Sequence, residues 1–273
     1  MNKVLKLKLN TKGRDIIVAD VHGQYHLLKT ALTKVKFDPK KDRIVIAGDL
    51  IDRGKNSKLA LDWVEKEYCF ATIGNHDAQH IFHRDLKLFS KNLACLPVDP
   101  WFVELEDEEY ESYFDRLKAA TYPAIEIETK KGLIGVVHGE LPYGETWSSA
   151  KERLNKQDYD FLYDCMWGRD LAKLAQKDSL TRKEQINYIV KDVKWMIHGH
   201  SPAKCFDYYP YSLANRLYID TAAYKASKPE KYPTAGITLF DAANPLVPIY
   251  TTGKRELVFA KQRNKESDIE NSF

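Results

Sequence analysis

The chain has 273 residues, of which 42 are Lys or Arg and 39 are Asp or Glu, giving a net charge of +3 with His neutral. Its hydrophobic content of 44% is enough for a sizeable core and excludes wholesale disorder, while the near balance of charge argues against bulk nucleic-acid binding. No apolar run reaches the roughly 18 residues that a membrane span needs, and the first residues lack the apolar core of a signal peptide, so we expect a cytoplasmic protein with no membrane partner.

The first part of the chain alternates short apolar runs with amphipathic stretches. This pattern predicts strands at residues 15–19, 43–47 and 69–73, and helices at residues 24–35 and 57–68. Such a βαβαβ order indicates a right-handed parallel sheet with helices packed on it.

The second part has a different order of predicted elements, with helical stretches around residues 148–192 between groups of strands. The strands are predicted at residues 123–129, 132–137, 194–197, 216–219 and 236–240. We interpret the chain as an α/β first half followed by a more antiparallel, β-rich second half. No stretch rich in Pro, Gly or Ser separates the halves, so we expect one domain over residues 1–273.

Two segments stand apart from this pattern. Residues 85–120 contain the acidic run 104–111, and we interpret them as an inserted helical hairpin with a solvated acidic face; a lid or recognition surface is the alternative. His80 and His83, just before this insert, are expected at packing or surface positions. The polar tail at residues 261–273 is expected to fray.

The four cysteines lie far apart in the sequence and form no CxxC pair, which argues against a zinc cage. They are Cys69, Cys95, Cys165 and Cys205. We interpret them as buried thiols, with disulfides as the alternative.

Polar side chains beside glycine follow five of the predicted strands. The five motifs are Asp20-Val-His22-Gly23, Gly48-Asp49-Leu-Ile-Asp52-Arg53-Gly54, Gly74-Asn75-His76-Asp77, His138-Gly139-Glu140 and His198-Gly199-His200-Ser201. Each motif alone is typical of a cap or a turn, but ordinary turns do not repeat histidine in this way. Because the carboxyl ends of parallel strands lie side by side, where open α/β sheets bind ligands, we expect the motifs to converge.

These residue types support a site for two metal ions. Oxygen and imidazole ligands without thiolate suit Mn, Fe, Zn or Ni. Two ions about 3.5–4 Å apart need a bridging carboxylate, which Asp49 can supply. Such a pair lowers the pKa of a bound water and holds phosphoryl oxygens, so no Ser or Cys nucleophile is required.

The combined motifs resemble the metallophosphoesterase signature. More narrowly, they resemble the phosphoprotein phosphatase family, in the bacterial and phage branch that includes bacteriophage lambda Ser/Thr protein phosphatase and symmetrical diadenosine tetraphosphate hydrolase. The resemblance spans residues 15 to about 222. It implies the calcineurin-like metallophosphoesterase fold, an α/β architecture with a central β-sandwich flanked by helices. It also implies two divalent metal ions, with Mn²⁺ as the first choice and Fe, Zn or Ni as alternatives.

The resemblance further implies a role for each motif residue. The first metal would be held by Asp20 and His22, both metals by Asp49, and the second metal by Asn75, His138 and His200. His76 would protonate the leaving group as general acid, oriented by Asp52. The substrate phosphate would be bound by Arg53, Asn75, His76 and Arg169, of which Arg169 rests on the shorter match Trp167-Gly168-Arg169.

The sequence departs from the family pattern at three positions. Glu140 stands where small residues are usual, and either a place at the substrate mouth or a surface position fits it. Ala222, in Tyr218-Ile-Asp220-Thr-Ala222, replaces a usual glycine. His198 precedes Gly199, and we expect it to be a neighbour of the site, with His200 as the ligand.

Two further residues separate the possible activities. Pro202 stands where nucleases and phosphodiesterases of the wider superfamily usually have a second histidine, and Asp52 is typically missing in the symmetrical hydrolases. We therefore predict a metal-dependent phosphoprotein phosphatase that hydrolyses phosphate monoesters of Ser, Thr or also Tyr, by attack of a hydroxide that bridges the two ions. A symmetrical diadenosine tetraphosphate hydrolase and a non-catalytic scaffold are the alternatives. The expected partner is a phosphoprotein or a phosphorylated small molecule, and the sequence does not indicate an oligomeric state.

Overall fold

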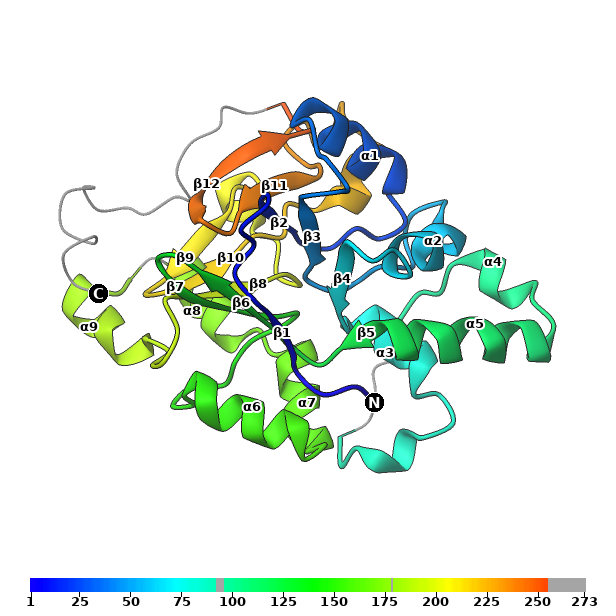
Figure 1. Ribbon diagram of the computed structural model, residues 1–273, viewed down its shortest axis with the longest axis horizontal. Coiled ribbons are helices and arrows are strands. Elements are labelled where there is room, and N and C mark those ends of the chain that lie inside the picture. Colours follow the sequence, from blue (N-terminus) through cyan, green and yellow to red (C-terminus); the bar gives the residue numbers. More distant parts are fainter. Residues whose placement is uncertain (92–95, 178, 255–273) are drawn as a thin grey trace.

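The computed structural model describes residues 1–91, 96–177 and 179–254, which are built around two six-stranded sheets (Figure 1). In spatial order, the first sheet contains β12 (Asn244–Thr251), β11 (Thr238–Asp241), β2 (Asp15–Val18), β3 (Arg43–Ile46), β4 (Cys69–Thr72) and β5 (Thr121–Tyr122). The second sheet contains β1 (Leu5–Leu7), β6 (Ile125–Thr129), β7 (Gly132–Val137), β8 (Trp195–His198), β10 (Arg216–Tyr218) and β9 (Tyr211–Leu213).

Helices surround these sheets. They are α1 (Tyr25–Lys34), α2 (Ala60–Val64), α3 (Asn75–Ile81), α4 (Pro100–Val103), α5 (Asp107–Ala120), α6 (Trp147–Asn155), α7 (Tyr159–Trp167), α8 (Asp170–Lys177) and α9 (Arg182–Gln185). In Figure 1, α1 and α2 lie at the upper right of the sheets, and α6 and α7 lie below them. The predicted α/β sandwich flanked by helices is therefore confirmed.

The parallel βαβαβ unit predicted for the first part of the chain is present. Strands β2, β3 and β4 pair in parallel, and α1 and α2 connect them. Both faces of these strands are buried, because Ile17 and Val45 face the second sheet while Ile16 and Ile44 pack with the helices. This two-sided burial explains why the strands are continuous apolar runs in the sequence rather than alternating ones.

The second half of the chain is less antiparallel than predicted. The pairs β6–β7, β9–β10 and β11–β12 are antiparallel, but β8 lies between β7 and β10 and is parallel to both. The reason is that α6 to α9 lie between β7 and β8 in the chain, and a long helical connection returns the chain in the same direction. The hairpin β11–β12 joins the first sheet by pairing β11 with β2.

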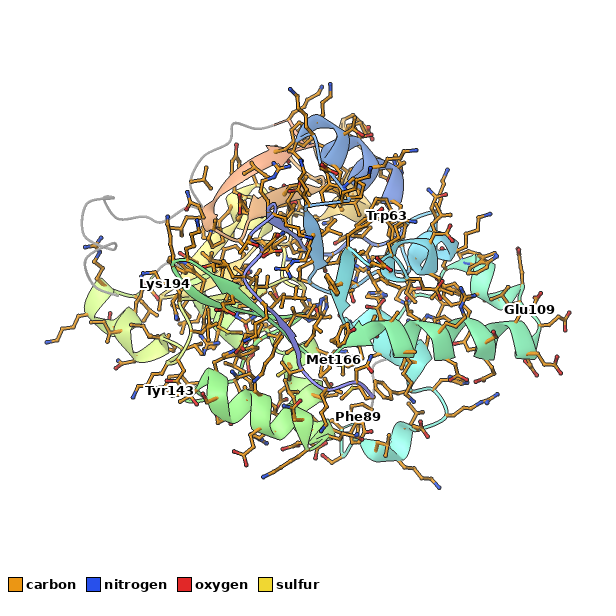
Figure 2. The ribbon with its side chains drawn as sticks, in the orientation of Figure 1. Trp63, Phe89, Glu109, Tyr143, Met166 and Lys194 are labelled. Carbon is orange, nitrogen blue, oxygen red and sulfur yellow. The ribbon has the colours of Figure 1, made fainter. Side chains whose placement is uncertain are left out.

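The described part of the predicted insert is helical and packs on the first half of the chain. Helix α5 contacts α2 and α3, and it buries Tyr113, Phe114 and Leu117. Its acidic first turn is exposed, and Glu109 points away from the protein there (Figure 2). Residues 92–95 of the insert and the predicted polar tail at 261–273 lie outside the described residues. That the chain forms one domain stays a prediction.

Two smaller expectations can be compared with the described residues. Cys69 and Cys165 are free, buried thiols as predicted, whereas Cys205 is free but exposed, because it lies in a short turn after β8; Cys95 is outside the described residues. Within the described ranges, no helix combines the length and the apolar character that crossing a bilayer would require.

The carboxylate of Asp42, just before β3, is held by several hydrogen bonds that should stabilise the fold. Its carboxylate accepts hydrogen bonds from the backbone N and the Nη2 of Arg14, at 2.8 and 2.7 Å, and from the backbone N of Asp38 at 3.1 Å. Burial acts to raise the pKa of Asp42, but these bonds outweigh it and the pKa is lowered. The carboxylate therefore contributes stability above its unfolded pKa, and this contribution is lost as the pH falls through the folded pKa.

We expect Asp42→Asn to reduce the free energy of unfolding by about 1–3 kcal/mol at pH 7, because charged hydrogen bonds are weakened or lost. The loss should be smaller at pH 3, below the unfolded pKa of about 3.9, because the stability contribution falls as the pH approaches the lowered folded pKa. Urea unfolding at both pH values measures it, with the exposed Glu67→Gln as the control. An equal loss at both pH values would contradict a charge effect.

Candidate metal centre

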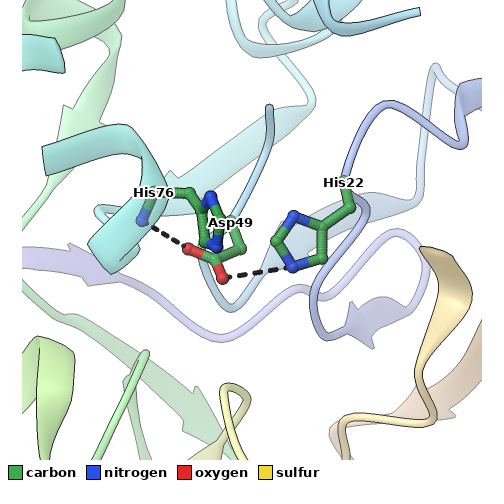
Figure 3. A group of neighbouring side chains, drawn as sticks. All are labelled: His22, Asp49 and His76. Atoms are coloured by element: carbon green, nitrogen blue, oxygen red, sulfur yellow. Dashed lines mark hydrogen bonds and ion pairs between the residues drawn. The ribbon is translucent and has the colours of Figure 1, made fainter. Parts of the chain in front are cut away.

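The predicted motifs meet where β2, β3 and β4 end, beside the ends of β7 and β8. Two groups of buried side chains place possible ligand atoms within 4.8 Å of one another: His22, Asp49 and His76 in one group, and Asp49, His138 and His200 in the other. Asp49 belongs to both groups. Figure 3 shows the first group, with Asp49 between His22 and His76.

The two oxygens of Asp49 face different histidines. Oδ2 lies 3.3 Å from Nε2 of His22, and Oδ1 lies 3.3 Å from Nε2 of His138. Oδ1 also accepts a hydrogen bond from the backbone N of His76 at 3.0 Å, which fixes the carboxylate (Figure 3). A carboxylate with one oxygen on each side is what a bridging position requires.

Backbone carbonyls determine which ring nitrogen of His22 and of His138 is free to bind a metal. Nδ1 of His22 lies 2.9 Å from the carbonyl oxygen of Ile51, and Nδ1 of His138 lies 2.7 Å from that of Ala47. A carbonyl can only accept, so Nδ1 carries the proton in both rings and the Nε2 lone pair points to Asp49. Burial also lowers the pKa of His22, to about 3, and lowers that of His138, so both rings are neutral as metal binding requires.

The other predicted ligands complete the cluster. Oδ1 of Asn75 lies 2.9 Å from Nε2 of His138, and Nδ1 of His200 lies 3.1 Å from the same atom. Asp20 lies on the His22 side, where its Oδ2 is 3.8 Å from Nε2 of His22, and its Oδ1 accepts the backbone N–H of His200 at 2.9 Å.

The residues present fit two divalent cations. Nε2 of His22 is buried and has no hydrogen-bond partner among the described residues. An unsatisfied buried nitrogen destabilises the folded state unless a bound species contacts it. Burial and the neighbouring Asp220 and Asp49 raise the pKa of Asp20 well above its usual value. Such a concentration of buried carboxylates, together with neutral imidazole and amide oxygen, suits hard or borderline divalent cations.

Glycine is required at two of the motif positions because other chain atoms approach closely. A Cβ on Gly74 would lie 2.1 Å from the backbone N of Asp49. Gly48 has a φ of +81°, and a Cβ there would lie 2.6 Å from Nδ1 of His138. The glycines therefore allow the strand ends to come together around Asp49.

Several site residues hold left-handed backbone conformations that L-residues rarely adopt. The φ angles are 44° for His22, 50° for Asp49, 65° for Asp52, 63° for Arg53 and 64° for His200. Such conformations cost on the order of 1–3 kcal/mol each and concentrate at functional sites. Their clustering here marks this region independently of the side-chain chemistry.

His76 and Asp52 form a buried pair at the edge of this cluster. Nδ1 of His76 lies 2.8 Å from Oδ2 of Asp52, and Nε2 of His76 is buried with no hydrogen-bond partner among the described residues. Burial acts to raise the pKa of Asp52, but hydrogen bonds from His76 and His80 outweigh it and lower the pKa to about 2. Asp52 is thus a carboxylate that can orient His76.

The two predicted phosphate-binding arginines are both exposed beside the cluster. The guanidinium of Arg53 lies 4.5 Å from the centre of the Tyr224 ring, and Tyr224 in turn contacts the ring of His22. Nε of Arg169 donates to Nε2 of His200 at 2.7 Å. Both guanidiniums therefore lie at the mouth of the site, where an anion could reach them.

The three residues that depart from the family pattern, Glu140, His198 and Ala222, are all buried, but they have different surroundings. Glu140 is buried, which excludes the surface alternative; it accepts hydrogen bonds from the backbone N of Leu171 and Ala172, at the start of α8 and next to Arg169. His198 is buried at the end of β8 and belongs to neither ligand group. Ala222 has a φ of 56°, a conformation that explains why glycine is usual there.

Asp220 is a site residue that sequence reasoning did not assign. It is buried against Asp20, and burial raises its pKa to about 6. The resemblance implies that the stretch Tyr218-Ile-Asp220-Thr-Ala222 packs near the metals, but it gives Asp220 no role. Its proximity to Asp20 depends on the end of β10, in the second sheet, lying beside the end of β2, in the first, which the sequence pattern does not reveal.

Comparisons with known proteins identify the family of the chain. The family of calcineurin-like phosphoesterases matches residues 14–204. Serine/threonine-protein phosphatase 2 of Escherichia coli (strain K12) is 28% identical over 209 residues, covering 76% of this chain and 86% of that protein. The symmetrical bis(5'-nucleosyl)-tetraphosphatase of Klebsiella pneumoniae is 27% identical over 175 residues, covering 59% of this chain and 60% of that protein.

A solved structure shows the same fold. The cold-active protein-tyrosine phosphatase of a psychrophilic Shewanella species superposes with a TM-score of 0.54 at 16% identity, covering 90% of this chain and 80% of that one. The chain belongs to the calcineurin-like phosphoesterase family, and it is a metal-dependent phosphoesterase with a cluster of residues that fits two metal ions.

Proposed function

We propose that this protein is a phosphoprotein phosphatase that hydrolyses phosphate monoesters of Ser or Thr, and also of Tyr. The observation that carries the proposal is the 2.8 Å contact between Asp52 and His76, with the other ring nitrogen of His76 left free. A serine or threonine alkoxide is a poor leaving group and needs a proton as the P–O bond breaks. An oriented histidine beside the metal cluster supplies that proton.

Two divalent cations complete the proposed site, and Mn²⁺ is the proposed species. The first would be held by Asp20, His22 and Asp49, and the second by Asp49, Asn75, His138 and His200. The geometric grouping has His76 rather than Asp20 beside His22 and Asp49. We assign Asp20 as the ligand because its Oδ2 lies 3.8 Å from Nε2 of His22, and we keep His76 as the proton donor that Asp52 orients. When bound, the cations would neutralise phosphate charge and supply a water of lowered pKa.

Other side chains of the site bind the phosphate and move the proton. Arg53 and Arg169 bind the phosphate oxygens, because a guanidinium can donate two parallel hydrogen bonds to an anion. Asp52 fixes the ring of His76 so that Nε2 faces the cluster. His76 then transfers its Nε2 proton to the leaving-group oxygen. The buried surroundings limit water around this proton, which favours its transfer to the substrate.

Hydrolysis of symmetrical dinucleoside tetraphosphates is the second candidate. It is favoured by the relatives with that activity, although this chain spans only 60% of the Klebsiella protein. Asp52 argues against it, since a nucleoside diphosphate leaves readily and depends less on a general acid.

The cytoplasmic location and the single domain also stay predictions.

Activity on three substrates, measured side by side with Mn²⁺, tests the proposal. We expect kcat/KM for a phosphoserine peptide or a phosphotyrosine peptide to exceed that for diadenosine tetraphosphate. Asp52→Asn is the matched variant, and it should lower phosphoserine hydrolysis more than dinucleotide hydrolysis, because only the alkoxide needs the proton. Hydrolysis of the dinucleotide alone by the wild-type protein would reverse the assignment.

A further inference from the structure

The carboxylate of Asp52 contacts more than His76. Its Oδ1 accepts the backbone N–H of Asp99 at 2.9 Å, and its Oδ2 accepts Nε2 of Gln79 at 3.0 Å. Nε2 of His80 lies 3.5 Å from the same Oδ2. Both oxygens are therefore held from outside the loop that carries Asp52.

Each of these contacts depends on residues 96–120, the described part of the insert that follows the gap at 92–95. Asp99 belongs to this segment, and its side chain also caps α4 by accepting the backbone N–H of Trp101 at 3.0 Å. The backbone N of Leu96 donates to Oε1 of Gln79 at 2.9 Å, which orients the amide of Gln79 towards Asp52.

The contact with His80 is held in the same way. Nδ1 of His80 lies 2.7 Å from the hydroxyl of Tyr110 on α5, and the ring of His80 stacks on Phe114 at 4.6 Å and 5°. His80 is buried, so this arrangement has no competition from bulk solvent. A chain of hydrogen-bonding groups thus runs from Tyr110 through His80 and Asp52 to His76.

We propose that residues 96–120 are a positioning element for the Asp52–His76 pair, and that Tyr110 of this element acts through His80 of α3. This inference rests on the proposed role of His76 as general acid. It gives the insert a function at the site, rather than that of a solvated surface hairpin.

The physical argument is that a carboxylate can orient an imidazole only if it is itself held. Asp52 has a left-handed backbone, and its carboxylate can rotate about χ1 and χ2. Without its outer donors it can therefore turn away from Nδ1 of His76. A misoriented His76 still leaves the metal cluster and the arginines in place. Loss of a positioning residue should therefore slow reactions that need the proton and spare those that do not.

Tyr110→Phe tests this directly, because it removes one hydroxyl and retains the ring that packs against Phe114. We expect kcat for a phosphoserine peptide to fall about three- to tenfold, the worth of one hydrogen bond. We expect kcat for p-nitrophenyl phosphate, whose leaving group scarcely needs a proton, and KM for both substrates to stay unchanged. In a His76→Asn background, Tyr110→Phe should have no further effect.

The matched control is Tyr159→Phe, which removes a hydroxyl that contacts only Gln157 among the bonds described, on α7 rather than on α5. It should leave both substrates unaffected. An unchanged kcat for the phosphoserine peptide in Tyr110→Phe, an equal loss on both substrates, or the same loss in the His76→Asn background would each overturn the inference. If His76→Asn itself shows no dependence on the leaving group, the proposed function fails instead.

Discussion

Asp49→Asn should lower kcat by about 10³-fold or more, equivalent to about 4 kcal/mol of transition-state stabilisation. The carboxylate faces His22 with one oxygen and His138 with the other, so it is placed to join the two halves of the cluster. An amide removes the negative charge and turns an N–H donor towards one of these histidines. Steady-state kinetics with saturating Mn²⁺, together with metal analysis of the purified variant, measure the effect.

Asn is a suitable replacement because it tolerates the left-handed backbone that Asp49 adopts, at a φ of 50°. The variant should therefore fold, and thermal unfolding checks this. Asp62→Asn, at an exposed position of α2, controls for loss of one negative charge elsewhere and should retain full activity. Full activity of Asp49→Asn with two bound ions would contradict the bridging role.

His76→Asn should lower kcat for a phosphoserine peptide by on the order of 10²–10⁴, the usual contribution of a general acid. With p-nitrophenyl phosphate the loss should be small, because p-nitrophenolate leaves without needing a proton. The prediction follows from the geometry of the ring: Nδ1 is bonded to Asp52, and Nε2 has no hydrogen-bond partner among the described residues. Rates on the two substrates at a fixed metal concentration measure the difference.

His26→Asn is the matched histidine control. His26 is exposed on α1, so its loss should leave both rates near those of the wild-type protein. An equal loss on both substrates in His76→Asn would instead indicate that His76 supports the metal cluster and is not the proton donor.

The strand ends could be predicted from the sequence because the information is local. The runs that form β2, β3 and β4 are buried on both faces, so each stands out as an uninterrupted apolar stretch followed by a polar motif. Parallel pairing then brings the motifs together without any further assumption. The structure places Asp20, Asp49 and Asn75 as this reasoning expects, while their roles as ligands stay predictions.

Other features depend on contacts between distant segments, which leave no local pattern. Helix α5 presents an ordinary amphipathic sequence, and nothing in it indicates that Tyr110 contacts His80, 30 positions earlier. Glu140 resembles a surface residue, yet it receives the N–H groups of a helix that begins at Asp170. The direction of β8 likewise depends on which strands it joins.

The pairing of β2 with β11 has a consequence for synthesis of the chain. Strand β2 carries the first motif, and its neighbours are β3 on one side and β11, more than 200 residues later, on the other. While the polypeptide is still growing on a ribosome, β2 is therefore an open edge with unpaired backbone groups, a hazard for association with other nascent chains. The sheet that supports Asp20 lacks the neighbour β11 of its strand β2 until residues 238–241 have been synthesised, so we expect that side of β2 to stay unpaired until late in synthesis.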